Sequence, residues 1–118
     1  PCSGTGVIRR QPDIRWNRQA ENLGRYQQTQ LQLLATAATL LRPGGTLVYA
    51  TCSLETEENE AVIDRFVELM PQFAVENCAG LLPEPARRLV DSAGFFRPSP
   101  ADDLDGFFAA RLVDQRCL

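Results

Sequence analysis

The sequence predicts an α/β fold, in which helices and strands alternate along the chain. Apolar residues recur every three to five positions from Leu23 to Leu41, as they do on one face of a helix. The short run from Thr46 to Thr51 is β-branched, apolar and aromatic, which is typical of a buried strand. A second helix and two further strands follow. This order is that of the second half of a doubly wound sheet, and we expect the chain to form that half.

Local signals delimit the two helices. The first helix ends where the Pro43–Gly45 segment turns the chain, because proline and glycine do not continue a helix. The second helix is predicted from Glu57 to Met70, with Thr56 as its N-cap. Acidic residues occupy its first turn, where the helix dipole stabilises negative charge, and Pro71 ends it.

The last third of the chain is predicted to contain two short strands. The first spans Phe73 to Cys78 and the second spans Phe107 to Val113, and an irregular proline-rich stretch from Leu82 to Pro100 lies between them. We expect Thr46–Thr51 to be a central parallel strand. The first helix should cover one face of the sheet, and the second helix should return the chain to Phe73–Cys78.

The composition is that of an ordinary globular protein. With 118 residues, 44% of them hydrophobic and 23% charged, the chain has material for one domain with a modest core. No apolar stretch approaches the roughly 18–20 residues that span a bilayer, and no secretory signal is visible, so we expect a cytoplasmic protein without a membrane partner. The chain begins inside what resembles a catalytic loop, with no strand before it. We therefore expect residues 1–118 to be part of a longer catalytic domain.

The number and spacing of the four cysteines indicate reduced thiols rather than disulfides. Cys2, Cys52, Cys78 and Cys117 include no Cys-x-x-Cys pair, and the chain has no histidine. This spacing disfavours a thiol redox protein and a structural zinc site, and we expect no metal. Scattered cysteines without an export signal are typical of a reducing compartment. We assign no functional role to Cys78 and Cys117.

Cys52 comes directly after the predicted strand, at the sheet edge where ligands of α/β folds bind. The N-terminus of the next helix would lower the pKa of this thiol, whereas Glu55, Glu57 and Glu58 would raise it, so the direction stays open. A lone cysteine at a strand end is usually a buried, inert thiol. A second loop thiol, Cys2, is what favours covalent chemistry here.

Cys2 lies in a short segment with one proline and two glycines. Proline restricts the backbone before the thiol, and the glycines allow the backbone to approach a planar ligand closely. The segment is not a dinucleotide-binding fingerprint, because no strand precedes it and a third glycine is absent. The candidate substrate-binding residues around the thiol are Pro1, Ser3, Gly4, Thr5 and Gly6.

Arginines are concentrated just after the Cys2 loop. The net charge of the chain is −3, yet its N-terminal segment is basic, and every basic residue of the chain is arginine. Guanidinium groups can bind phosphate oxygens through two hydrogen bonds, so this cluster suits a nucleic acid. Ordinary surface arginines on a solvated segment are the alternative. The candidate phosphate-binding residues are Arg9, Arg10, Arg15 and Arg18.

Four segments stand out together and extend over nearly the whole chain. They are Pro1–Arg10 with Pro12–Trp16, Leu41–Gly45 with Leu47–Leu54, Glu57–Glu60, and Asp105–Phe108. In this order they resemble the Sun/Fmu-type RNA cytosine-5 methyltransferases, a family that includes bacterial enzymes for 16S ribosomal RNA. The first segment is similar to the substrate loop of the family, and the second is similar to its nucleophile segment.

The resemblance implies a Rossmann-like class I methyltransferase that uses S-adenosylmethionine and methylates C5 of cytosine in ribosomal RNA, with 16S RNA as the expected partner. C5 is a poor nucleophile, and addition of a thiolate to C6 moves electron density onto it. In this family the Thr-Cys thiol makes that addition, so Cys52 is the expected nucleophile. The Pro-Cys thiol helps release the methylated product, which is the role expected of Cys2. The target base must leave its stack.

Some features of the family are absent from these residues. Its glycine-rich S-adenosylmethionine loop, and an acidic residue two positions before Cys2, would lie upstream. We therefore expect the cofactor-binding half to be missing and the chain alone to be inactive. Pro98-Ser99-Pro100 also stands where the family often has a Pro-His pair.

Two other functions stay open. DNA cytosine-5 methyltransferases use a Pro-Cys thiol as the nucleophile, which would move that role from Cys52 to Cys2. A non-catalytic RNA-binding fragment would account for the arginine cluster and for the missing cofactor half.

Overall fold

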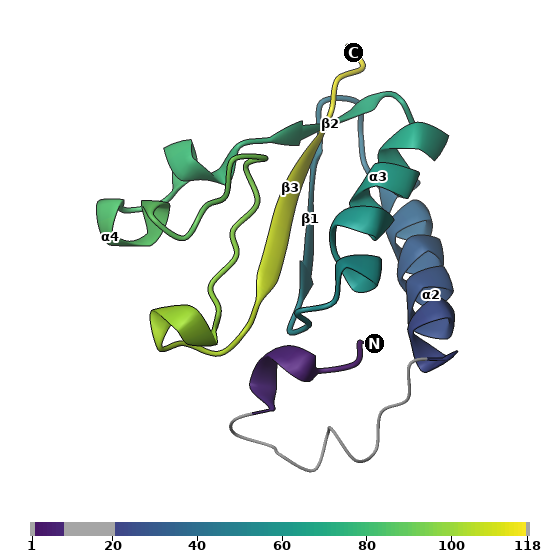
Figure 1. Ribbon diagram of the computed structural model, residues 1–118. Coiled ribbons are helices and arrows are strands. Elements are labelled where there is room, and N and C mark those ends of the chain that lie inside the picture. Colours follow the sequence, from purple (N-terminus) through teal and green to yellow (C-terminus); the bar gives the residue numbers. More distant parts are fainter. Residues whose placement is uncertain (1, 9–20, 118) are drawn as a thin grey trace.

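The chain forms a three-stranded sheet with two helices on one of its faces. The computed structural model describes residues 2–8 and 21–117. In chain order, the helices and strands of these residues are α2 (Glu21–Ala38), β1 (Thr46–Thr51), α3 (Glu60–Leu69), β2 (Phe73–Glu76), α4 (Glu84–Arg87) and β3 (Phe108–Asp114). Figure 1 shows α2 and α3 side by side on the same side of the sheet. The predicted alternation of helices and strands is confirmed.

The sheet has the strand order β1–β3–β2, and β3 is antiparallel to both neighbours. Thr46 of β1 lies opposite Val113, and Phe73 of β2 lies opposite Asp114. Our expectation of a central parallel strand at Thr46–Thr51 is therefore wrong for the described residues. There, β1 is an edge strand and its paired neighbour is antiparallel.

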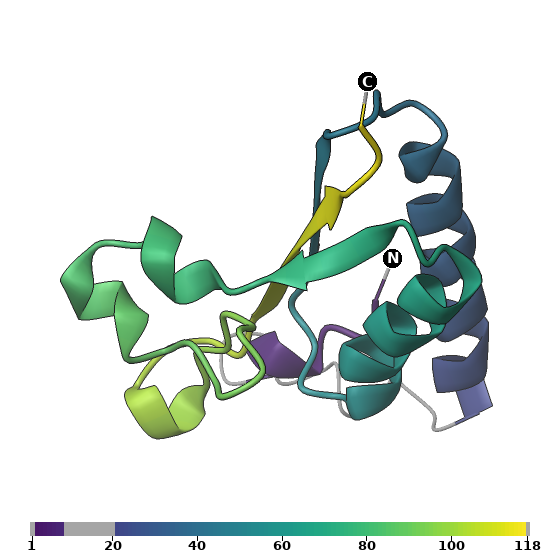
Figure 2. The same cartoon turned by 90° about the horizontal axis from the view of Figure 1, so that it is seen from above.

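The long connection between β2 and β3 explains this difference. Both β1 and β2 run opposite to β3, and hence in the same direction as each other, as expected of two strands joined by a helical crossover. Residues 77–107 extend away from the sheet and return, so that β3 enters between the other two strands (Figure 1 and Figure 2). Local patterns do not determine the direction in which a strand returns after so long an excursion.

The core lies between the sheet and the two long helices. Phe108 and Leu112 of β3 are fully buried on this side. Tyr49 of β1 packs edge-on against Phe108, and Phe66 of α3 packs against Phe73 of β2. These contacts pack β1 against β3 and α3 against β2, and the site described below lies where β1 ends and α3 begins.

The second helix begins differently from the prediction. Thr56 is not its N-cap, because a single 3-10 turn, Thr56–Glu58, comes first and α3 starts only at Glu60. The two are separated by Asn59, whose backbone angles (φ −110°, ψ −100°) are not helical. The break coincides with two side chains that point into buried hydrogen bonds with the cysteine segments.

The remaining bounds differ from prediction by a few residues. The first helix spans Glu21–Ala38, and β3 begins and ends one residue later than predicted. β2 ends at Glu76 because Asn77 starts a 3-10 turn, in which its side-chain oxygen accepts a hydrogen bond from the backbone N–H of Ala79 at 2.8 Å. The proline-rich stretch contains the short helix α4, which lies on the projecting part of the molecule (Figure 2).

Candidate active site

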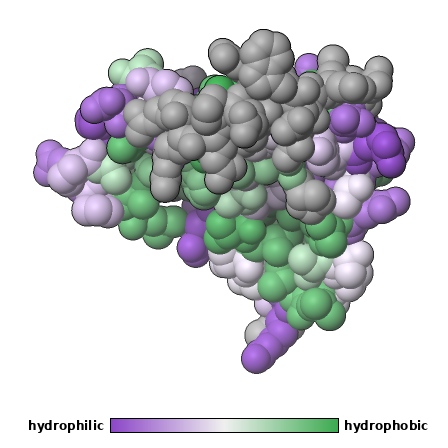
Figure 3. Space-filling model, turned by 90° about the horizontal axis from the view of Figure 1, so that it is seen from below, coloured by the Kyte–Doolittle hydropathy of each residue, from purple (hydrophilic) through white to green (hydrophobic). Residues whose placement is uncertain are grey.

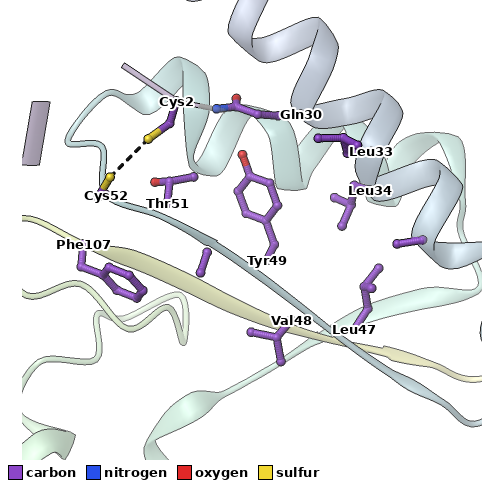
Figure 4. A pocket seen from close by; sticks show the side chains of 12 residues that line it. Cys2, Gln30, Leu33, Leu34, Leu47, Val48, Tyr49, Thr51, Cys52 and Phe107 are labelled. Carbon is purple, nitrogen blue, oxygen red and sulfur yellow. Dashed lines mark hydrogen bonds between the residues drawn. The ribbon is translucent and has the colours of Figure 1, made fainter. Parts of the chain in front are cut away.

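Two thiols from distant parts of the sequence meet beyond the carboxyl end of β1. Cys52 follows the last residue of this strand, and the Cys2 loop approaches it so that the two Sγ atoms are 3.3 Å apart (Figure 4). Both side chains are half-buried, and both are free thiols. At this distance one S–H can donate to the other sulfur. Two nucleophilic atoms so close together can act on the same bound molecule.

Backbone hydrogen bonds hold the Cys2 loop against two other segments. Gly6 N donates to the carbonyl oxygen of Cys52 at 2.8 Å, and Gly106 N donates to the carbonyl oxygen of Gly6 at 2.6 Å. A Cβ atom on Gly6 would lie 2.1 Å from the Gly106 oxygen, so no larger residue fits without movement. The absence of a side chain at Gly6 therefore allows a close approach between segments of backbone.

A buried carboxylate connects the two cysteine loops. Glu58 is 0% exposed, and its Oε1 accepts hydrogen bonds from Ser3 N at 2.7 Å and from Gln30 Nε2 at 3.1 Å. Its Oε2 accepts from the hydroxyl of Ser3 at 2.5 Å and from the hydroxyl of Ser53. Ser3 follows Cys2 and Ser53 follows Cys52, so one carboxylate binds the residue after each thiol.

The neighbouring side chain, Asn59, holds the Cys52 segment on both sides of the thiol. Its Oδ1 accepts a hydrogen bond from the Thr51 hydroxyl at 2.6 Å, and its Nδ2 donates to the carbonyl oxygen of Ser53 at 2.9 Å. Asn59 is 1% exposed. Neither Glu58 nor Asn59 was predicted to be a site residue, and Glu58 was considered only as a first-turn acid whose charge would raise the pKa of the Cys52 thiol. The segment Glu57–Glu60 of the family resemblance was the available signal.

Several effects raise the pKa of the Cys52 thiol. Burial is the largest, and the hydrogen bond and the electrostatic interaction with Cys2 act in the same direction. A backbone hydrogen bond at Cys52 lowers the pKa, and the carboxylate of Glu58 raises it. The sequence left the direction open. In the structure the shift is upward, which favours the protonated thiol over the thiolate.

A groove of about 470 Å³ opens beside the thiols, within the range of small-molecule sites. Cys2 and Cys52 line one end of it, together with Thr51 and Tyr49 (Figure 4). Phe107, which precedes β3, lies on the Cys52 side of the groove (Figure 4). Burial raises the pKa of Tyr49, whose hydroxyl donates to the backbone oxygen of Glu58 at 2.6 Å.

The rest of the groove is apolar and follows β1 and the facing side of α2. Its wall includes Leu33 of α2, which is 54% exposed, and Val48 of β1, which is 62% exposed. Figure 3 shows apolar residues gathered in several places on one face of the molecule. Large apolar side chains are seldom gathered on a free surface, which indicates that another part of a protein or a ligand covers this side.

The other candidate residues fall into two groups. Ser3, Gly4 and Gly6 are buried, and Thr5 Oγ1 accepts a hydrogen bond from Leu54 N at 2.9 Å, so these residues connect the two loops. Their side chains are not among those lining the groove. The candidates that lie outside the described residues are Pro1, Arg9, Arg10, Arg15 and Arg18.

Within residues 2–8 and 21–117, no three or more cysteine, aspartate or glutamate side chains are grouped so that they could hold a metal ion. None of the helices in this part of the chain is long and apolar enough to cross a membrane.

Known methyltransferases share both the sequence and the fold of this chain. The model of the family described as 16S rRNA methyltransferase RsmB/F matches residues 1–113. Over 113 residues the chain is 41% identical to the ribosomal RNA small subunit methyltransferase B of Salmonella arizonae. This match covers 96% of this chain and 24% of that protein.

Solved structures extend this similarity to the fold. The crystal structure of PH0851 superposes with a TM-score of 0.82 at 35% identity, over 95% of this chain and 24% of that one. A methyltransferase homolog protein from Pyrococcus horikoshii has a TM-score of 0.69 at 30% identity, over 97% of this chain and 36% of that one.

The structural neighbours of this chain have methyltransferase folds, and its α/β structure is part of such a fold. The chain belongs to the RsmB/F family of 16S rRNA methyltransferases, which confirms the resemblance found in the sequence. It spans only about a quarter of the length of the curated relatives it matches.

Proposed function

We propose that this chain is part of the catalytic domain of a longer enzyme that methylates C5 of a cytosine in ribosomal RNA, with 16S RNA as the substrate. The observation that carries the proposal is the 3.3 Å separation of the Cys2 and Cys52 sulfurs. Both thiols belong to segments of the family resemblance, and both line the same groove.

Cys52 is the proposed nucleophile. Its thiolate adds to C6 of the cytosine, the C5–C6 double bond opens, and electron density moves onto C5. C5 can then form a bond to an electrophilic methyl group, while the bond between that methyl group and the methyl donor breaks. Loss of the proton from C5 and departure of the Cys52 sulfur from C6 restore the aromatic ring. The raised pKa favours the protonated thiol, so Cys52 must give up its proton to solvent or to another base before its sulfur attacks C6.

Cys2 is proposed to act on the release step. Its sulfur lies within hydrogen-bonding distance of the Cys52 sulfur, so it is beside C6 of any base attached to Cys52. From there a thiol or thiolate can move a proton while the C6–sulfur bond breaks. This position explains how two cysteines can serve one reaction without both bonding to the base.

S-adenosylmethionine is the proposed methyl donor, and it would supply the electrophilic methyl group that C5 accepts. We assign none of the described residues to its binding. The described groove is mostly apolar, and it does not contain the glycine-rich strand–turn–helix that binds such cofactors in doubly wound folds. We therefore propose that donor binding belongs to other parts of the longer enzyme and that residues 1–118 alone are inactive.

The RNA is proposed to bind across the Cys2 loop and the arginines that follow it. Arg9, Arg10, Arg15 and Arg18 would bind phosphates, and the target cytosine would leave its stack to reach the thiols. The half-buried position of both sulfurs is compatible with this requirement, because a base stacked in a helix could not approach them.

The activity can be tested on the full-length protein that carries this chain. It is incubated with unmodified 16S RNA and S-adenosylmethionine, and the digested RNA is examined for 5-methylcytidine by nucleoside mass spectrometry. We expect this product with the wild-type protein, and none with Cys52→Ala or with residues 1–118 alone. Methylation at another atom, or full activity in Cys52→Ala, would contradict the proposal.

A further inference from the structure

Glu58 is a buried charged group for which the proposed mechanism has no use. Its carboxylate receives four hydrogen bonds, and all four donors are neutral: one backbone N–H, one side-chain amide and two hydroxyls. A carboxylate has about four lone-pair sites, so these donors fill its accepting capacity. Burying a charge is costly, and an apolar side chain would pack at this position without that cost.

Three of the hydrogen bonds to Glu58 come from Ser3 and Ser53, the residues that directly follow the two cysteines. The carboxylate accepts two hydrogen bonds from Ser3: one oxygen binds the backbone N–H and the other binds the hydroxyl. The oxygen that binds the Ser3 hydroxyl also binds the hydroxyl of Ser53. The two hydroxyls are themselves 3.3 Å apart, which equals the separation of the two sulfurs. Glu58, in the 3-10 turn that precedes α3, is therefore hydrogen-bonded to the Cys2 loop and to the Cys52 loop at once.

We propose that Glu58 is a positioning residue that sets the separation and orientation of Cys2 and Cys52. The proposal rests on the two-thiol function described above, and it adds a residue that touches neither the base nor the methyl donor. Asn59 supports the same arrangement from the Cys52 side, through Thr51 and the Ser53 carbonyl. The non-helical turn at Asn59 allows both side chains to point inward from adjacent positions.

The chemistry of the side chain predicts a graded series of variants. Glu58→Gln keeps one oxygen for Ser3 N and Gln30, while its amide would face two hydroxyls that can rotate to accept. Glu58→Ala loses all four acceptor contacts and leaves buried donors unpaired. Ser3→Ala removes a single hydroxyl and keeps the backbone bond, so it perturbs the loop with little risk to folding. Glu57→Gln is the matched control, because Glu57 is the exposed neighbour.

Thiol spacing can be measured without catalysis. Phenylarsine oxide reacts with two nearby thiols to give a cyclic dithioarsinite and water, and peptide mass spectrometry of the full-length protein identifies the bridged cysteines. We expect a Cys2–Cys52 bridge at similar concentrations of reagent in wild type and in Glu57→Gln. Ser3→Ala and Glu58→Gln should need more reagent, and Glu58→Ala more still.

Methylation kinetics provide the second readout. Because misplacement of a reacting group by about 1 Å can cost on the order of 100-fold, kcat should fall by about that factor in Glu58→Ala and by less in Glu58→Gln and Ser3→Ala. KM for RNA should change much less than kcat, since the proposed phosphate contacts are made by the arginines that follow the Cys2 loop and not by Glu58 or Ser3. Circular dichroism and thermal unfolding identify any variant that fails to fold. If Glu58→Ala fails to fold, Glu58→Gln and Ser3→Ala test the positioning role.

The outcomes separate the two proposals. Unchanged arsenical bridging in folded Glu58→Gln and Ser3→Ala would overturn the positioning role, whatever happens to kcat. Weaker bridging with unchanged kcat would also overturn it. If bridging depends on Glu58 but the wild-type protein methylates no RNA, the positioning of the thiols stands and the proposed function fails.

Discussion

Gly6 and Gly106 meet backbone to backbone. Gly106 N donates to the Gly6 oxygen at 2.6 Å, and a Cβ atom on Gly106 would lie 2.7 Å from Gly6 Cα. Gly6 N is also bonded to the Cys52 oxygen. Three segments that are far apart in the sequence are therefore tied together at one point, and this is possible because neither glycine has a side chain.

Replacing Gly6 with alanine should separate these segments. The new methyl group would clash with the backbone of Gly106 and Cys52, and overpacking of this kind typically costs about 1–3 kcal/mol. Chemical denaturation followed by circular dichroism would measure the loss. Gly24→Ala is the control, because no atom lies within 4 Å of its Cβ position in α2, and alanine there should stabilise by about 0.5–1 kcal/mol. Equal effects of the two changes would contradict the tight contact.

The reactivity of Cys52 should depend on pH in a direction set by its raised pKa. Alkylation by iodoacetamide requires the thiolate, so the rate should rise with pH, with a midpoint above that of a cysteine in an unstructured peptide. Cys2→Ala removes a hydrogen bond and an electrostatic interaction that raise the pKa, and it should shift the midpoint to lower pH. Rates at Cys52 can be followed by peptide mass spectrometry. A wild-type midpoint at or below that of the peptide would show that the shift has the opposite sign.

The apolar side of the groove should make the isolated chain self-associate. β1 is an edge strand of the described sheet, and Val48 on it is 62% exposed. Val48→Lys should keep residues 1–118 monomeric at concentrations where the wild-type chain forms larger species, as measured by size exclusion with light scattering. Leu81→Lys, at a residue 53% exposed and outside the groove, is the control and should have little effect. A wild-type chain that stays monomeric would argue that this side needs no cover.

Neutralising the arginines after the Cys2 loop should weaken RNA binding. Binding through phosphates releases counterions, so the salt dependence of the affinity should become shallower by about 0.7 for each contact with single-stranded RNA that is lost. Filter binding of the full-length protein over a range of salt concentrations would show this. Arg65→Gln is the control, because Arg65 forms a surface ion pair with Glu68 on α3. An unchanged slope would remove these residues from the RNA site. The four to be replaced with glutamine are Arg9, Arg10, Arg15 and Arg18.

The sequence predicted the parts of the fold that depend on local patterns. The strand Thr46–Thr51 is confirmed with the predicted bounds. A short β-branched, apolar run between turn signals strongly favours a strand over other local structures. The predicted central, parallel position of Thr46–Thr51 was wrong for the described residues, since it depends on how residues 77–107 return to the sheet. The same distinction applies to the site. Cysteine chemistry singled out Cys2 and Cys52, whereas Glu58 was predicted only as an acidic residue of a first helical turn, because its burial is set by tertiary contacts.

The two thiols can be separated by one experiment on the full-length enzyme. Cys2→Ala and Cys52→Ala variants are incubated with RNA and S-adenosylmethionine, and covalent protein–RNA complexes are resolved on a denaturing gel. Cys2→Ala should accumulate the complex, because Cys52 can still attack C6 while release is slow, and Cys52→Ala should form none. A complex that appears with Cys52→Ala and is missing with Cys2→Ala would reverse the roles and contradict the assignment of Cys52 as the nucleophile.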